Sequence, residues 1–171
     1  SRSFANAVPA MLILLMVGAL SGSWMTSGVI PTMIYYGLEV LRPEFFLPAT
    51  VLLCIVISVA TGSSWSTIAT IGVALIAVGN ALGINPAWSA GAIISGAYFG
   101  DKISALSDTT VLASSSAGTP LFTHIRFMMV TTVPSFVITL IVFLVASLMH
   151  DDSSAMMAAD FSNDLKETFH I

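Results

Sequence analysis

Long apolar stretches interrupted by small polar residues make up most of the chain. The first stretch runs from Val8 to about Leu38 and is almost purely aliphatic up to Leu20. A run of serine, glycine and threonine then dominates residues 21–28, and Pro31 follows. Glycine loosens a helix and proline removes a backbone donor, so this run predicts a break between two half-helices. The alternative is a helix–helix contact, because small residues let transmembrane helices approach closely.

The middle of the chain contains three shorter apolar segments. The first two, Leu47–Ala60 and Ile68–Leu82, flank the polar cluster Thr61–Thr67, and a Gly-Ile-Asn-Pro turn follows them. The third, Trp88–Phe99, leads into the polar segment 100–110. A helix needs about 20 apolar residues to cross the hydrocarbon core of a bilayer. Each segment is shorter than that, which favours helices that are broken within the membrane.

The C-terminal third of the chain predicts one conventional span and a polar connector. After another short segment, Val111–Gly118, residues 121–126 are expected to lie at the membrane interface and Phe127–Met149 to cross the bilayer. We therefore divide the chain into a transmembrane region, residues 1–149, and a connector, residues 150–171. Apolar residues recur every four positions in the connector, which puts them on one helical face for a membrane surface or a partner helix. These residues are Met157, Phe161, Leu165 and Phe169.

Composition and charge place the chain in a membrane. Of its 171 residues 56% are hydrophobic and only 8% are charged, whereas a soluble domain carries about 25% charged residues. A cytoplasmic enzyme, a nucleic-acid-binding protein and a disulfide-bonded secreted domain all fit this composition poorly. We predict an all-α fold, a polytopic transmembrane helical bundle with broken helices. The lipid bilayer is its expected partner, and both chain ends suggest part of a longer protein.

The polar segment 100–110 holds the groups that are hardest to explain as membrane packing. It contains Asp101 and Asp108, and an aspartate at the centre of a membrane helix costs about 2.5–3.5 kcal/mol on insertion scales. Gly100 favours local unwinding, which would free backbone carbonyls. Carboxylates, hydroxyls and carbonyls are the ligands that hard cations such as Na⁺ prefer, and transporters build such sites from broken helices. The segment therefore predicts a cation site with three candidate hydroxyl ligands, Ser104, Ser107 and Thr109.

Two other interpretations of the segment remain open. In a continuous helix, the spacing of seven residues would set Asp101 and Asp108 on one face, about 10 Å apart. In an aqueous loop, Asp101 and Lys102 would be solvated, and Asp108 would cap a helix that begins at Thr109.

The cluster at residues 61–67 is a second, less specific source of oxygen ligands. Thr61 and Ser63 are the candidates, and packing between helices is the alternative role. His124 is expected at the interface rather than in a proton relay. The sequence shows neither Cys/His metal spacing nor a phosphate-binding glycine loop, so no cofactor is expected.

Three blocks of the sequence, Gly100–Thr110, Thr119–Arg126 and Thr131–Pro134, closely resemble the NhaC family of Na⁺/H⁺ antiporters. Further blocks similar to that family occur in order upstream, at 22–28, 31–37 and 61–65. The resemblance implies Na⁺/H⁺ antiport by a multi-pass protein of the bacterial cytoplasmic membrane, which is not an enzyme. Some relatives exchange organic acids such as malate and lactate, so proton- or sodium-coupled organic acid antiport is the alternative function.

The resemblance also bears on partners. Full members of the family have more spans and a second half, so this chain is expected to be an internal portion of the first half. Its main partner is then the remainder of the same protein. Nucleic acid is not expected as a partner, and homo-oligomerisation and membrane orientation are left open. Residues 112–117 are richer in hydroxyl groups than the family pattern.

The mechanism implied by the resemblance is competition of Na⁺ and H⁺ for a buried carboxylate. Desolvation raises the pKa of a carboxylate, and only the ionised form binds Na⁺. Asp108, flanked by hydroxyl groups, is the first choice, and Asp101 is the second because the adjacent Lys102 can compensate its charge. Two such carboxylates can titrate as a coupled pair. An intramembrane aspartyl protease fits poorly, because its two carboxylates must share a proton about 3 Å apart.

Overall fold

The computed structural model describes residues 43–149, together with residues 15, 16, 19, 22–24, 26–29, 32 and 36. Throughout these residues the regular structure is helical, and no strand occurs among them. The predicted all-α class is therefore confirmed for the described part of the chain. The connector predicted at residues 150–171 lies outside it.

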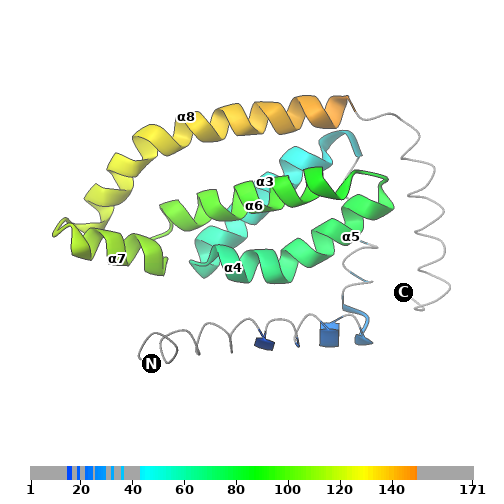
Figure 1. Ribbon diagram of the computed structural model, residues 1–171, viewed down its shortest axis with the longest axis horizontal. Helices are drawn as coiled ribbons and strands as arrows, with labels where there is room; N and C mark the ends of the chain where they lie inside the picture. Colours follow the sequence, from blue (N-terminus) through cyan, green and yellow to red (C-terminus); the bar gives the residue numbers. More distant parts are fainter. Residues whose placement is uncertain are drawn as a thin grey trace, which may run out of the picture.

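Helix α3, Phe46–Thr61, follows a short 3₁₀ turn and ends at a glycine. Gly62 has a left-handed backbone with φ +69°, and its N–H donates to the carbonyl oxygen of Ser58 at 2.8 Å. Glycine adopts this conformation without the Cβ penalty that other residues carry. The chain reverses direction at this point, so the next helix runs back along α3 (Figure 1).

Three consecutive elements make up this returning arm. They are α4 (Ser64–Thr67), a π-helical turn (Ile68–Gly72) and α5 (Val73–Ala81), and together they form one uninterrupted helix, the 64–81 helix. Ser63 caps it, because the Ser63 Oγ accepts a hydrogen bond from the backbone N–H of Ser66 at 3.3 Å. The polar cluster therefore interrupts the helical backbone only briefly.

Helix α6, Pro86–Ile103, runs parallel to α3 and packs closely against it. Along both helices the contacts advance in the same direction, since Gly96 meets Val51 and Gly100 meets Ile55. A Cβ at Gly100 would lie 2.7 Å from the Ile55 carbonyl oxygen, so a larger residue would push the two helices apart. The prediction that Gly100 unwinds the chain is wrong. Gly100 is helical and permits close packing, and α6 continues to Ile103.

The chain is nevertheless broken between the two aspartates. Residues 104–107 separate α6 from α7, Asp108–Ser116, and the backbone is extended at Ser104 (ψ 129°) and Ser107 (ψ 128°). The alternative of one continuous helix through both carboxylates is therefore wrong. The unwound segment exists, but it begins after Ile103.

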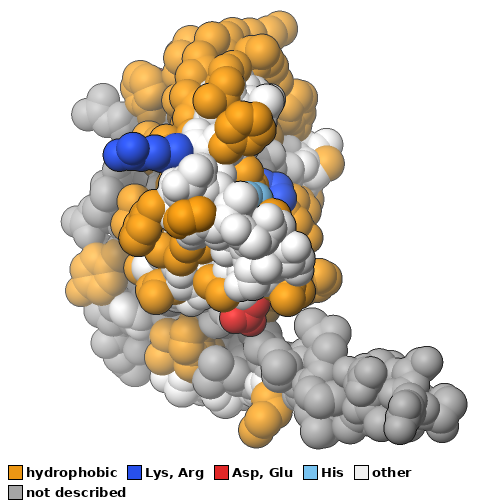
Figure 2. Space-filling view, turned by 90° about the vertical axis from the view of Figure 1, so that its left-hand side faces the viewer, with side chains coloured by type: hydrophobic (Ala, Val, Ile, Leu, Met, Phe, Trp, Pro, Cys, Tyr) orange, Lys and Arg blue, Asp and Glu red, His pale blue; other side chains and the backbone are white. Residues whose placement is uncertain are grey.

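Helix α8, Leu121–Leu148, returns along α6. Two aromatic contacts join these helices. Phe99 stacks on Phe136 with the ring centroids 4.2 Å apart, and Trp88 meets Phe143 edge to face with the ring centroids 6.1 Å apart. With 28 residues, α8 is about 42 Å long, which exceeds the roughly 30 Å of the hydrocarbon core. The helix is therefore long enough for its first turns to extend beyond the hydrocarbon core, and the interfacial position of residues 121–126 stays a prediction. Hydrophobic side chains cover much of the face in Figure 2, as expected against lipid or further helices.

Two helices in the described part of the chain are long and apolar enough to cross a membrane, the 64–81 helix and α8. The sequence predicted only one conventional span, Phe127–Met149, because the polar cluster hid the start of the other helix. Near the N-terminus, Gly28 has φ +81° in a turn that follows helical residues, in agreement with the predicted break. The buried core consists of apolar residues from α3, α5, α6, α8 and the turn between α5 and α6: Phe46, Leu47, Val51, Cys54, Leu75, Val78, Leu82, Ile84, Ala92, Ile93 and Phe143.

Candidate ion site at two helix breaks

The two helix breaks touch each other. Gly62, between α3 and α4, lies against Leu106 in the unwound segment between α6 and α7. A Cβ at Gly62 would be 2.6 Å from the backbone oxygen of Leu106, so a side chain at this position would force one break to move. We call this region, residues 58–67 and 101–110, the junction. The ends of α3 and α6 and the starts of α4 and α7 all belong to it.

Ser104 ties the two breaks together. Its side chain is buried, and its Oγ donates to the carbonyl oxygen of Val59 at 2.8 Å and accepts from the N–H of Leu106 at 3.2 Å. The Val59 carbonyl belongs to the last turn of α3, where carbonyls lack partners within the helix. The hydroxyl proton is thereby committed, and one lone pair remains for the predicted role as a cation ligand.

Asp101 lies in the last turn of α6 and is only 7% exposed. Its Oδ2 accepts a hydrogen bond from the Oγ of Ser64 at 3.2 Å, and no other described side chain donates to this carboxylate. Ser64 is the first residue of the 64–81 helix. The start of that helix, which carries partial positive charge, therefore lies beside the Asp101 carboxylate across the junction.

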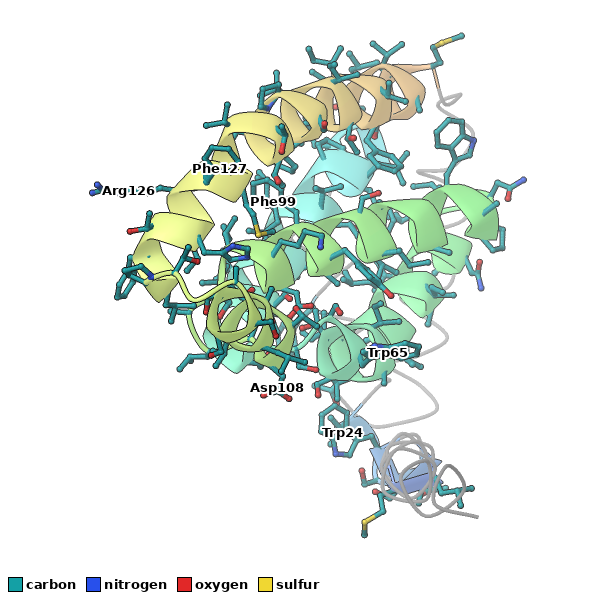
Figure 3. The ribbon with its side chains drawn as sticks, turned by 60° about the vertical axis from the view of Figure 1, so that its left-hand side comes forward. Trp24, Trp65, Phe99, Asp108, Arg126 and Phe127 are labelled. Atoms are coloured by element: carbon teal, nitrogen blue, oxygen red, sulfur yellow. The ribbon has the colours of Figure 1, made fainter. Side chains whose placement is uncertain are left out.

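Asp108 has the opposite surroundings. It is the first residue of α7 and is exposed. Figure 3 shows its side chain beneath α7, at the lower edge of the bundle in that view. Ser107 is buried, and its Oγ lies 2.9 Å from the Oγ1 of Thr109 in a hydrogen bond between the two hydroxyls. The structure therefore places Ser107 and Thr109 as a pair beside Asp108.

The hydroxyls of the first break form a short chain. The Oγ1 of Thr61 is 3.4 Å from that of Thr67, and Thr67 donates to the carbonyl oxygen of Ser63 at 2.9 Å. Thr67 is buried, whereas Thr61 is exposed at the rim of the junction. The Ser63 hydroxyl serves as the cap of α4. Thr61 and Ser63 thus border the site rather than contact Asp101 through any hydrogen bond of the described structure.

Two residues of the junction were missing from the predicted ligand set. Ser64 makes the side-chain hydrogen bond to Asp101, and buried Thr110 donates to the carbonyl oxygens of Asp101 and Lys102, both at 3.4 Å. Both lie in polar clusters that the sequence identified. Nothing local in those clusters distinguishes them from their neighbours, because the contact between Ser64 and Asp101 joins residues 37 positions apart.

Lys102 points elsewhere. Successive residues of a helix are rotated by about 100°, and Lys102 is exposed and lines a crevice between α6 and α8. No ion pair joins it to Asp101 or to any other described residue. The charge compensation expected from adjacency stays a prediction.

The chemistry of the junction suits a monovalent cation. One buried carboxylate, several hydroxyls and the carbonyls of two helix ends supply hard oxygen ligands. In the described part of the chain no group of three or more His, Cys, Asp or Glu residues is placed to hold a metal ion. A site for a multivalent metal held by several carboxylates or imidazoles is therefore not formed by these residues.

Comparison with known proteins gives extensive matches. The chain matches the Na⁺/H⁺ antiporter family over residues 2–118 and 96–167. It is 53% identical over 149 residues to the malate-2H⁺/Na⁺-lactate antiporter of Bacillus subtilis, which covers 87% of this chain and 32% of that protein. It is 48% identical over 157 residues to the Na⁺/H⁺ antiporter NhaC of Alkalihalophilus pseudofirmus, with 89% and 34% covered.

A third relative carries a different name. The arginine/ornithine antiporter ArcD of Halobacterium salinarum is 44% identical over 149 residues, with 87% of this chain and 31% of that protein covered. The chain thus spans about a third of the length of the curated relatives it matches. No solved structure matches it significantly. The family match extends over nearly all residues and agrees with two apolar helices of membrane-spanning length, so this membrane protein belongs to the Na⁺/H⁺ antiporter family.

Proposed function

We propose that this chain is part of a multi-pass antiporter that exchanges Na⁺ for H⁺ across the cytoplasmic membrane, and that Asp101 is the carboxylate for which the two ions compete. The observation that carries the proposal is the burial of Asp101 where two broken helices meet. Intramembrane carboxylates are costly and mark ion or proton pathways. Two relatives named NhaC, 48% and 47% identical, bear the name Na⁺/H⁺ antiporter and support this function.

The hydrogen bond between Ser64 and Asp101 allows both ions to use the same site. When Asp101 is ionised, the Ser64 hydroxyl donates to Oδ2, and the lone pairs of Oδ1 and of the serine oxygen are available to Na⁺. When Asp101 is protonated, it loses its charge and becomes a donor, so the hydrogen bond can reverse direction. Na⁺ then loses its anionic ligand, and binding of one ion excludes the other.

Helix ends balance the charge of this site. The C-terminal ends of α3 and α6 carry partial negative charge and favour a cation, while the start of the 64–81 helix carries partial positive charge beside the carboxylate. Asp108 would act as the second carboxylate at the exposed side, with Ser107, Thr109, Thr61 and Ser63 along the approach. Burial favours Asp101 over Asp108, the reverse of the order suggested by the sequence.

The proposed activity is transport without a covalent step, so we place no catalytic residue and no cofactor in this chain. The chain covers about a third of its relatives, and alternating access therefore requires the rest of the protein.

The test uses the full-length protein reconstituted in vesicles, with proton flux measured by an internal pH dye on addition of Na⁺. Asp101→Asn is expected to abolish the Na⁺-dependent flux. Glu44→Gln is the matched control, because Glu44 is an exposed carboxylate in the 3₁₀ turn before α3, and it should retain the flux. Asp101→Glu keeps a carboxylate at this position. Flux through Asp101→Glu would show that the fold tolerates a substitution at position 101, so loss of flux in Asp101→Asn would then report loss of the ion site. Full exchange by Asp101→Asn would refute the proposal.

Exchange of a small organic acid is the second candidate function. The relatives from B. subtilis and H. salinarum are named for molecules that carry carboxylates. The observation in this chain that favours it is the side chain of Lys102, which lines a crevice between α6 and α8 and makes no described contact with Asp101.

A further inference from the structure

We propose that the crevice between α6 and α8 binds a small carboxylate that has a hydrogen-bond donor, a hydroxyl or an amine, next to its carboxylate group. The crevice has a volume of about 210 Å³. It is lined by polar and aromatic side chains of both helices: Ser95, Tyr98, Phe99, Lys102, Thr132, Ser135, Phe136 and Thr139. This inference refines the second candidate function above and names the residues that would carry it.

The α6 wall of the crevice supplies donors. Ser95, Tyr98 and Lys102 are three and four residues apart, so they lie along one side of α6. No described residue forms a hydrogen bond or ion pair with any of these three side chains. The Lys102 ammonium has three N–H groups, and the two hydroxyls add one donor each. An unpaired cation at the end of a row that includes two such hydroxyls is suited to a carboxylate.

The α8 wall supplies acceptors. The hydroxyls of Thr132, Ser135 and Thr139 each donate to a carbonyl one turn earlier in α8, at 2.8, 3.0 and 2.9 Å. A hydroxyl has a single proton, so once that proton is used within the helix only lone pairs remain for a ligand. This wall therefore matches a ligand group that donates.

The two walls together select the ligand class. A carboxylate at Lys102 places the neighbouring hydroxyl or amine of the same molecule toward α8, and the stacked rings of Phe99 and Phe136 offer an apolar surface for its carbon atoms. Figure 3 shows Phe99 between α6 and α8. The volume is below the roughly 300–1,000 Å³ of pockets for drug-sized ligands, which favours a small acid. Bare Na⁺ would be repelled by Lys102, and an inorganic anion such as chloride would leave the α8 acceptors unmatched.

The test compares three acids that differ only at the second carbon. L-lactate carries a hydroxyl there, L-alanine an ammonium and propionate only hydrogen. Binding of each sodium salt to the purified full-length protein is measured by calorimetry at constant Na⁺. We expect L-lactate or L-alanine to bind about tenfold or more tightly than propionate, because only they pair with the α8 acceptors. Equal affinity for all three acids, or binding of none, would overturn the inference.

Matched variants locate the binding in the crevice. Lys102→Gln should weaken the preferred acid about tenfold or more, whereas Arg126→Gln, which removes an exposed cation that points away from the bundle in Figure 3, should not. Thr132→Ala should reduce the difference in affinity between the preferred acid and propionate. Thr131→Ala should leave that difference unchanged, although both hydroxyls donate to the Met128 carbonyl. Equal effects within either pair would refute the assignment.

A parallel measurement keeps the two proposals apart. Na⁺/H⁺ exchange is recorded in vesicles without any carboxylate. Exchange without acid binding refutes only the crevice site, and acid binding without exchange refutes only the proposed Na⁺/H⁺ antiport.

Discussion

Asp101 and Asp108 lie on either side of the same unwound segment, yet their helices affect a negative charge in opposite ways. Asp101 is in the last turn of α6, where the partial negative charge of the helix end disfavours a carboxylate, and it is buried. Asp108 is the first residue of α7, where the helix start favours a carboxylate, and it is exposed. Asp108 therefore stabilises its own helix. Asp101 depends on a second helix, through Ser64, to offset its cost.

This difference identifies which charge the fold itself does not require. A carboxylate at a helix start is a common way to stabilise a helix and needs no further explanation. A buried carboxylate at the C-terminal end of a helix adds nothing to local stability, so a role in binding is the better explanation for it. Four measurements test the difference between the two aspartates and the junction to which both belong.

The largest contrast is in transport. Asp101→Asn should reduce Na⁺-dependent proton flux in vesicles to background, because the buried anionic ligand is lost. Asp108→Asn should retain a measurable part of the flux, since the Asp108 carboxylate is exposed and forms no hydrogen bond with the described residues. If Asp108→Asn loses the Na⁺-dependent flux and Asp101→Asn retains it, the roles of the two carboxylates are reversed.

The second contrast tests whether the junction depends on contact between the breaks. Gly62→Ala adds a Cβ that collides with the Leu106 backbone and also strains a left-handed residue. Gly118→Ala is the control, because Gly118 has φ +63° but no atom within 4 Å of its Cβ position. Left-handed strain alone costs about 1–2 kcal/mol, so Gly62→Ala should lower the thermal unfolding midpoint well beyond Gly118→Ala. Equal decreases of the unfolding midpoint in the two variants would show that the contact between Gly62 and Leu106 does not contribute to stability.

The third contrast concerns the partner of Asp101. Ser64→Ala removes the donor to Oδ2 and one oxygen ligand, so the Na⁺ concentration for half-maximal flux should rise about tenfold. Ser66→Ala, two residues further along α4 and exposed, should leave that concentration unchanged. An unchanged Na⁺ concentration for half-maximal flux in Ser64→Ala would show that the hydrogen bond from Ser64 to Asp101 has no part in Na⁺ binding.

The smallest contrast is in stability. Asp108→Asn removes a favourable charge from the start of α7 and should lower the free energy of unfolding by about 0.3–1 kcal/mol at low salt. Asp101→Asn removes an unfavourable charge from the end of α6 while keeping an acceptor for Ser64, so it should not lower the free energy. Thermal unfolding of the purified protein at two salt concentrations measures both changes. A loss for Asp101→Asn as large as that for Asp108→Asn would contradict the charge argument.

The sequence predicted the general architecture because its signals are local. Low charge and long apolar runs indicate membrane helices, and the polar residues clustered around Gly62 and at 104–107 indicate where helices are interrupted. The family resemblance was also visible in local blocks, and the comparisons confirm it.

Non-local contacts explain what the sequence could not predict. Gly100 and Gly62 are both glycines in polar surroundings, but one permits close packing of α3 against α6 and the other ends a helix. The same residue type favours both outcomes, and only the position of the neighbouring helix decides. The pairing of Ser64 with Asp101 likewise depends on how α3 and α6 align. That alignment is absent from local patterns. The ranking of Asp108 above Asp101 used only local features, the hydroxyls beside Asp108 and the lysine next to Asp101.

The π-helical turn at Ile68–Gly72 has a geometric consequence for the junction. A π-helical turn accommodates one more residue than an α-helical turn, so it rotates everything that follows by about 100° relative to an unbroken α-helix. The residues before the turn, Ser64 and Thr67, thereby face the polar junction, while Leu75 and Val78 after it face the apolar core. The extra residue thus changes the angular register between the polar first part and the apolar second part of the 64–81 helix. Deleting a single residue from this turn would bring hydroxyls and hydrocarbon out of register.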